Sequence, residues 1–313
     1  MLAAMTTLRT CFIAWAFLLA APIASARVID DFTVGPISLT NTRDAGYVRQ
    51  TQTGLDPAHV IGGVRDWTYD VRDNFSDPAA PDAGVRMGVA PPAAAGEPDK
   101  FFYDADIRVT AVNFRLIYDA GNSAAGLALD MLLLGHNAIA IDVLASNFEA
   151  NRGHLDIMVD SAQSVQNRYK FMPLPNSATP YRVVMPLFTS TQPTPQSIKR
   201  LVLGTGNGVL FGDFELGGIK TVNTADFNSD GVVDGADFLV WQRDAGSTAV
   251  ANSNSTGDAD LNGVVNNLDL NLWRLANRSG DAGVHSAPEP TCGALFALAA
   301  SVALPLLRRR SFS

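Results

Sequence analysis

The chain has 313 residues, of which 47% are hydrophobic and 17% are charged, and its formal net charge is −8. This length allows one large domain and one small one. The acidic balance argues against a nucleic-acid partner, because phosphate binding needs a basic surface. The two cysteines, Cys11 and Cys292, both lie in terminal segments, which excludes a disulfide framework for the residues between them.

Residues 1–26 have the pattern of a secretory signal peptide. Arg9 precedes an apolar run over residues 11–24, and the segment ends in the small residues Ala24-Ser25-Ala26. We expect cleavage after Ala26 and export of the chain. Residues 27–287 then carry a formal charge of about −11, because the terminal segments hold more basic than acidic residues.

Residues 27–222 alternate between apolar and polar positions over short runs, which is the period of β-strands. In the clearest run, residues 154–160, Leu155, Ile157 and Val159 share one face. Turn residues separate the runs and favour a two-sheet antiparallel β-sandwich. The expected strands are 28–32, 47–51, 107–118, 127–134, 138–144, 154–160, 181–185, 198–203 and 211–216. Residues 77–99, rich in Pro and Ala, predict a surface loop.

Three segments of this region carry a resemblance to a known fold. They read VIDDF at 28–32, VIGGVRDW at 60–67 and GDFELGGI at 212–219. These segments are similar to those of galactose-binding-like jelly rolls. The resemblance implies a jelly-roll β-sandwich that serves for display or carbohydrate binding.

The same region has no pattern typical of an active site. Its glutamates and histidines are scattered, at Glu97, Glu149, Glu215, His59, His136 and His154. The histidines lack metal-ligand spacing, and no serine lies in a nucleophile elbow. We therefore expect a non-catalytic domain. The alternative is a polysaccharide-degrading glycoside hydrolase or lyase, whose pair of acidic residues the sequence does not single out.

Aromatic and polar side chains near the Gly62-Gly63 turn are the candidates for sugar binding. Aromatic rings pack on the apolar faces of sugars, and polar groups bind their hydroxyls. The candidates are Trp67, Tyr69, Tyr103, Arg65 and Asp66. The alternative is that the rings pack in the core. A separate hypothesis places a structural calcium between the first and last strands, at Asp30, Asp31 and Asp213.

Residues 226–275 contain one short pattern twice. It reads DFNSDGVVDGADFLVWQR from Asp226 and DADLNGVVNNLDLNLWRL from Asp258. Oxygen ligands recur at positions 1, 3, 5, 7, 9 and 12, position 7 offers its backbone carbonyl, and position 6 is Gly. Position 12 is expected to open a helix. The residues are Asp226, Asn228, Asp230, Val232, Asp234 and Asp237 in the first copy, and Asp258, Asp260, Asn262, Val264, Asn266 and Asp269 in the second.

This spacing predicts two calcium sites. The alternative, a solvated Asp/Asn-rich linker, is disfavoured by two copies in matching register. The first copy has four carboxylates and the second has three, so we expect the first to bind calcium more tightly.

The two repeats, within residues 223–278, resemble a type I dockerin, a small α-helical module of paired EF-hand-type loops and helices. The following helices carry matching apolar stripes, Phe238, Val240, Trp241 and Leu270, Leu272, Trp273. The resemblance implies docking to a cohesin-like partner on a scaffold. Positions 10 and 11, often Ser-Thr in that family, are Gly235-Ala236 and Asn267-Leu268. Calcium binding is therefore carried over residue by residue, and cohesin binding is not.

The C-terminal segment has the order of a sorting signal. A spacer at 279–287 leads to Pro288-Glu289-Pro290, the apolar run 291–307 and three arginines at 308–310. The apolar run predicts a membrane-embedded stretch with a cytoplasmic basic stop. The order resembles the PEP-CTERM signal, which implies processing by an exosortase and delivery to the cell surface or extracellular matrix. The alternative is a C-terminal anchor that is never cleaved.

Overall fold

The computed structural model describes residues 26–42, 46–72, 84–91, 99–105, 111–123, 126–131, 134–148, 154–161, 164–187, 197–204, 212–250 and 253–280. Residues 23–277 form one compact unit. Almost all of the expected signal peptide lies outside the described residues. So does the whole expected sorting segment 288–313, including Pro288, Glu289 and Pro290. Within the described residues, no helix is both long and apolar enough to cross a membrane.

The first sheet has seven antiparallel strands. They are β1 (Val28–Asp30), β2 (Ile37–Thr42), β5 (Gly84–Ala90), β6 (Lys100–Ala105), β8 (Ala138–Phe148), β11 (Tyr181–Pro186) and β13 (Gly212–Val222). Their order is β11-β8-β13-β6-β5-β2, and β1 also pairs with β13. The long strand β13 therefore lies in the middle of the sheet, bonded to β8 on one side and β6 on the other.

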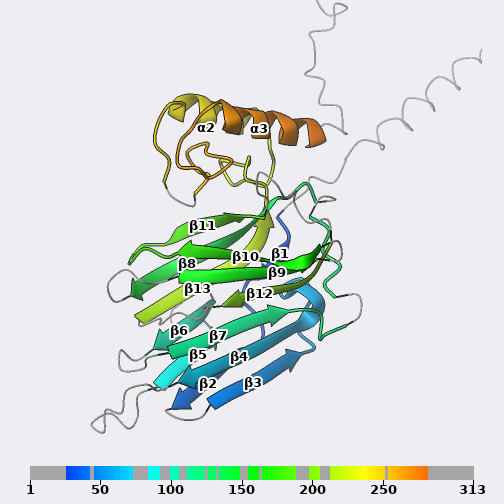
Figure 1. Cartoon of the computed structure of the whole chain (residues 1–313), viewed down its shortest axis with the longest axis vertical. Helices are drawn as coiled ribbons and strands as arrows, with labels where there is room; N and C mark the ends of the chain where they lie inside the picture. The colour runs from blue at the N-terminus through cyan, green and yellow to red at the C-terminus, as the bar shows by residue number, and fades with distance from the viewer. Residues whose placement is uncertain are drawn as a thin grey trace, which may run out of the picture. The chain divides into compact units, whose positions relative to one another are not determined.

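The second sheet has six antiparallel strands. They are β3 (Gly46–Thr53), β4 (Val64–Arg72), β7 (Ala111–Tyr118), β9 (His154–Ser161), β10 (Ser164–Pro173) and β12 (Ile198–Gly204). Their order is β10-β9-β12-β7-β4-β3. The short 3-10 helix η1 (Ile61–Gly63) leads into β4. The two sheets form the layers seen in Figure 1, so the predicted antiparallel β-sandwich is confirmed.

Aromatic side chains fill the space between the two sheets. The Phe101 ring, on β6 of the first sheet, lies 5.8 Å from the rings of both Trp67 and Phe114 in the second. It also lies 5.7 Å from the ring of Phe214, on β13. All four side chains are buried. Because these contacts join both sheets, the sandwich has one shared core.

Two expectations about this region are wrong. The surface loop expected at 77–99 contains β5, a strand between β6 and β2, with Val85, Met87 and Val89 buried in the core. Its alternation is masked in the sequence by the Pro and Ala residues around it. Among the described residues of the strand expected at 127–134, only Leu129 forms a β-bridge, and Leu134 N bonds Asp130 O in a turn. Leu127 N and Leu129 N donate to Lys199 O and Ile198 O at the start of β12, and among the described residues this pairing ends at Leu129.

Two helices follow the sandwich, α2 (Gly235–Asp244) and α3 (Asn267–Gly280). With the loops before them they surround a small second core of Ala225, Phe227 and Ala259. The chain passes from β13 to this part through a short, bonded connector. Asn137 Nδ2 donates to Thr224 Oγ1 at 3.0 Å, and Thr224 N donates back to Asn137 Oδ1 at 2.8 Å. The connector is thus fixed to the residue that precedes β8.

Candidate metal centre

The first repeat loop, residues 226–237 (loop 1), is shaped by hydrogen bonds from its own side chains. Asp226 Oδ2 accepts from Gly231 N at 3.0 Å, and Asp230 Oδ1 accepts from Val232 N at 2.8 Å. Asn228 Oδ1 accepts from Asp230 N at 3.0 Å. Gly231, at position 6, has φ +90°, a conformation that glycine adopts without strain. The sharp turn required by a calcium loop is therefore built into the chain.

Asp237, at position 12, closes loop 1 from the inside. Its side chain is buried, and Oδ1 accepts from Phe227 N at 2.7 Å and from Asn228 N at 3.1 Å. Oδ2 accepts from Asp234 N at 2.9 Å, which completes a capping box with Asp234 as N-cap of α2. The helix thus begins at Gly235, two residues before position 12, where it was expected to open. The cap side chain at position 9 determines this start.

The second repeat loop, residues 258–269 (loop 2), repeats this arrangement. Asp269 Oδ1 accepts from Ala259 N at 2.8 Å and from Asp260 N at 3.1 Å, and its Oδ2 accepts from Asn266 N at 2.7 Å. Asp258 Oδ2 accepts from Gly263 N at 2.8 Å, as Asp226 does from its own glycine. The sequence repeat is therefore also a repeat of hydrogen bonds.

Carboxylate oxygens converge in loop 2, and loop 1 has one carboxylate oxygen without a partner. In loop 2, oxygens of Asp258, Asp260 and Asp269 lie within 4.8 Å of one another. In loop 1, Asp226 Oδ1 is buried and has no hydrogen-bond partner, although a buried carboxylate oxygen normally has one. A hard divalent cation such as calcium coordinates several oxygens of this kind, so both loops fit it chemically.

Burial opposes the charge that these carboxylates would carry. It raises the pKa of Asp226 to about 6, and neighbouring Asp237 and Asp230 add to the rise. Burial likewise raises the pKa of Asp258 to about 6, with Asp269 and Asp260 contributing. A cation among these groups would offset the repulsion and favour the ionised forms.

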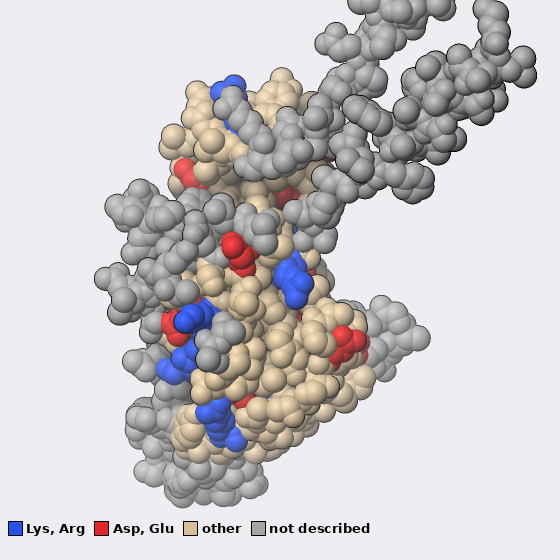
Figure 2. Space-filling view, turned by 90° about the vertical axis from the view of Figure 1, so that its right-hand side faces the viewer, with Lys and Arg blue, Asp and Glu red and all other residues tan. Residues whose placement is uncertain are grey.

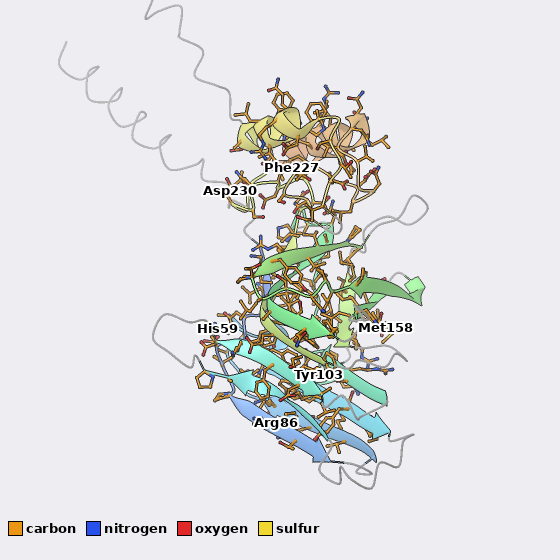
Figure 3. All side chains as sticks on the ribbon, turned by 90° about the vertical axis from the view of Figure 1, so that its left-hand side faces the viewer. His59, Arg86, Tyr103, Met158, Phe227 and Asp230 are labelled. Carbon is orange, nitrogen blue, oxygen red and sulfur yellow. The ribbon has the colours of Figure 1, made fainter. Side chains whose placement is uncertain are left out.

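The side chains proposed from the sequence for sugar binding lie in the sandwich core. Trp67, Tyr69, Tyr103 and Arg65 are all buried. Trp67 stacks on Phe101, and Figure 3 shows Tyr103 within the sandwich. Since a stacking platform needs exposed rings, these four residues do not form one. The observed positions of the three aromatic rings agree with the alternative, that they pack in the core.

The calcium hypothesis for Asp30, Asp31 and Asp213 is also wrong. Asp30 is buried in a two-bond ion pair with Arg65, at 2.5 and 2.6 Å, and it accepts from the Tyr118 hydroxyl at 2.8 Å. Asp31 bonds His59 Nδ1 at 2.7 Å. Asp213 lies further along β13, opposite Asp104, whereas Asp30 pairs with Ile219. The three carboxylates therefore have separate partners.

Polar groups gather on the outward face of the six-stranded sheet, opposite the buried rings. Arg49 binds Asp66 Oδ2 at 2.6 Å, whereas Asp66 Oδ1 is buried without a partner. Asp160 and Arg200 face each other on β9 and β12, and Asp160 Oδ1 and Arg200 Nε also lack partners. Met158, labelled in Figure 3, lies on the same face. Asp160 alternates with Leu155, Ile157 and Val159 along β9 and so lies on the opposite face.

Basic and acidic side chains are interspersed on the surface. On the face shown in Figure 2, the described Lys and Arg residues lie in small groups between Asp and Glu residues.

No protein-family profile and no curated protein matches this sequence. Among solved structures, the chain is similar to the family 11 carbohydrate-binding module of the cellulosomal cellulase Lic26A-Cel5E of Clostridium thermocellum. The identity is 12% and the TM-score 0.28, over 63% of this chain and 93% of that one. A family 30 carbohydrate-binding module matches at 10% identity and TM-score 0.31, over 43% and 82%. A family 29 module matches at 9% and 0.21, over 60% and 90%. At TM-scores below 0.5 these similarities carry no argument about ligand or activity.

Proposed function

We propose that the chain is an exported attachment protein whose residues 223–278 fold around two calcium ions and dock to a protein partner. The observation that carries the proposal is the buried Asp226 Oδ1, which has no partner inside a loop already turned for a cation. Loop 2 supports it with three converging carboxylates. In this proposal the sandwich is a display or carbohydrate-binding domain.

The residues that would hold calcium are those at positions 1, 3, 5, 7 and 12. They are Asp226, Asn228, Asp230, the Val232 carbonyl and Asp237 in loop 1, and Asp258, Asp260, Asn262, the Val264 carbonyl and Asp269 in loop 2. Position 9 has a different task. Asp234 Oδ1 accepts from Ala236 N and Asn266 Oδ1 accepts from Leu268 N, both at 2.7 Å, so these side chains cap the helices. Such a residue reaches the ion through a water.

Bound calcium supplies charge that stabilises the buried carboxylates. Without it, Asp237 and Asp269 still hold their loops through backbone hydrogen bonds, and burial raises the pKa of both. The chain's own bonds therefore shape the loops, and the cation would make the ionised state stable.

Docking to a partner, cohesin-like in the first instance, is supported by exposed apolar side chains on the two helices. Leu239 on α2 and Leu268 and Leu275 on α3 are more than half exposed. Apolar side chains that a small module leaves in water are typical of an interaction surface. The residues at positions 10 and 11 differ from the pair frequent in dockerins, so the preferred partner is expected to differ as well.

Export and surface sorting rest on residues 1–26 and 288–313. The signal peptide, the Pro288-Glu289-Pro290 motif and the basic end support secretion, exosortase-type processing and a place at the cell surface or in the matrix. Mass spectrometry of the mature protein tests this: termini at Arg27 and near Pro288 support it, and an intact C-terminus would favour a permanent anchor.

Isothermal titration of the full chain with calcium tests the central proposal. We expect two ions per chain, and weaker binding after Asp226→Ala or Asp258→Ala. Asp244→Ala, at the far end of α2 and outside both loops, is the matched control and should bind as the wild type does. Loop 1 has one carboxylate more than loop 2 through Asp234, whose charge would act on the ion across a water, so Asp226→Ala should cost more affinity than Asp258→Ala. Absence of binding heat in the wild type would refute the proposal.

Polysaccharide binding by the outward face of the six-stranded sheet is a second candidate function. The side chains of Arg200 and Asp160 are partly exposed there, at 36% and 30%, and lie beside half-buried Met158. Side chains fixed by ion pairs with hydrogen-bonding capacity to spare suit sugar hydroxyls, and apolar groups suit the sugar ring.

Affinity electrophoresis of the full chain in gels containing soluble β-glucan, xylan or galactomannan tests this second candidate. We expect retardation in at least one gel and its loss in Arg200→Ala. Arg86→Ala changes an exposed arginine on the other sheet, so it should leave retardation intact. Unretarded wild type in all gels would remove sugar binding from the proposal.

A further inference from the structure

Two tryptophans form crossed hydrogen bonds between the repeats. Trp241, on the helix after loop 1, donates from Nε1 to the carbonyl of Asn266 in loop 2 at 2.9 Å. Trp273, on the helix after loop 2, donates from Nε1 to the carbonyl of Asp234 in loop 1, also at 2.9 Å. Both carbonyls belong to position 9. Each indole therefore contacts the loop of the other repeat at the same point.

Position 9 is directly bonded to the carboxylate at position 12. Asp234 N donates to Asp237 Oδ2 at 2.9 Å, and Asn266 N donates to Asp269 Oδ2 at 2.7 Å. A displacement of the position-9 backbone therefore moves a hydrogen bond of the carboxylate that closes the loop. The indole of one repeat is in this way linked, through one residue, to a proposed calcium ligand of the other.

The rings that carry these donors are fixed by packing. Phe238 lies between them, with ring centroids 5.8 Å from Trp241 and 5.2 Å from Trp273. Gly257, immediately before loop 2, is so close to α2 that an added Cβ would lie 2.8 Å from Trp241 Cα. Both indoles are partly buried against the second core, so packing restricts the directions in which each N–H can move.

The backbone gives a second link between the repeats. The segment that leaves α2 pairs with loop 2: Gly246 N donates to Val265 O at 2.8 Å, and Ala249 N donates to Gly263 O at 2.9 Å. Gly263 and Val265 are positions 6 and 8, on either side of the position-7 carbonyl proposed as a ligand. The end of the first helix is therefore hydrogen-bonded to the turn of the second loop.

We propose that Trp241 and Trp273 are positioning residues that each set the calcium affinity of the opposite loop, so that the two sites bind as one coupled unit. This inference rests on the proposed calcium binding. In this inference, each indole N–H acts on the loop of the other repeat and not on the loop before its own helix. A purely local reading predicts the reverse, that each tryptophan matters for the loop directly before its own helix.

The test uses the full chain with one loop disabled at a time. Asp258→Asn with Asp260→Asn leaves only loop 1 to titrate, and Asp226→Asn with Asp230→Asn leaves only loop 2. Trp→Phe removes the N–H donor and keeps an aromatic ring. With loop 2 disabled, we expect Trp273→Phe to weaken calcium binding about three- to tenfold, as the loss of one hydrogen bond implies, and Trp241→Phe to change it less than about twofold. With loop 1 disabled, the two effects should exchange.

Phe238→Leu is the control, because it disturbs the ring packing of both tryptophans and neither donor. It should affect the two loops alike. Crossed effects of the tryptophan variants support the inference. Effects on the adjacent loop, equal effects on both loops, or no effect would overturn it. Absence of calcium binding in the unmodified chain would instead refute the proposed function.

A second measurement leaves the tryptophans unchanged, in case their variants do not fold. In the otherwise native chain, disabling loop 1 should weaken calcium binding by loop 2 at least about fivefold, because the crossed bonds then reach a loop that no longer binds a cation. An unchanged loop 2 affinity would show independent sites and overturn the coupling.

Discussion

Asp237→Ala is the substitution that most directly tests how loop 1 is held together. The native carboxylate is buried and accepts from the backbone N–H groups of Phe227, Asn228 and Asp234. Alanine offers no acceptor, so these donors either remain unpaired or rotate toward water. The N3 half of the capping box on α2 is lost with it.

The expected cost follows from those bonds. A hydrogen bond contributes about 1 kcal/mol net, and a buried donor left unpaired costs about 1–3 kcal/mol. Because parts of loop 1 are exposed, some donors regain water. We therefore expect Asp237→Ala to destabilise the calcium-free module by about 3 kcal/mol. This is large for a small folding unit and should melt α2 well before the sandwich unfolds.

Far-UV circular dichroism of the full chain in chelator follows this change, since the described helices α2 and α3 belong to the module. Thermal melts should show an early loss of helix in Asp237→Ala. Asp244→Ala removes a partly exposed carboxylate at the other end of α2, which pairs with exposed Arg243, and should change the free energy of unfolding by less than about 0.5 kcal/mol. Coinciding melts of the two variants would refute the hydrogen-bond argument.

Three further outcomes are expected. In chelator, the module should be most stable near or below pH 4 and lose stability as pH rises through about 6, because folding raises the pKa of Asp226 and Asp258. Thermal melts across this pH range test the prediction, and a melting temperature that does not change with pH would contradict it. Arg65→Ala leaves its carboxylate partner on β1 buried without a counter-charge and should lower the free energy of unfolding in denaturant by about 3–5 kcal/mol. The exposed control Arg86→Ala should lower it little, and equal losses in both variants would show that the buried pair does not stabilise the fold. Gly257→Ala forces a side chain against the α2 backbone at φ +93° and should lower the helical melting temperature; an unchanged melt would argue against that close contact.

The calcium-type loops were predictable because everything that shapes them is local. Asp226 bonds Gly231 within the same loop, and Asp237 bonds residues no more than ten positions away. The spacing of side chains in the sequence therefore predicts the geometry of each loop. The start of α2 was placed two residues late, because the spacing of ligands does not show which side chain caps the helix. The crossed tryptophan bonds join residues 25 and 39 positions apart, and no local pattern reports them.

The sandwich was predictable in class and much less so in its residues. In β4, Arg65, Trp67 and Tyr69 alternate with Asp66 and so share one face. Two of the three are large rings, so that face is the inner one, and Arg65 follows them inward to its buried partner on β1. The alternation along β4 therefore indicates that these side chains face inward. It does not indicate which strands lie beside β4, because those strands come from distant parts of the chain.

The pairing of the first and last strands of the sandwich has a consequence for longer assemblies. Val28 on β1 lies opposite Lys220 on β13, and Arg27 and Thr221 exchange hydrogen bonds just beyond them. The chain therefore enters and leaves the sandwich at one place. Because its two ends are adjacent, the domain adds little to the distance between the segments that precede and follow it in the chain. Such a unit can be gained, lost or exchanged between proteins without altering the spacing of the parts that flank it.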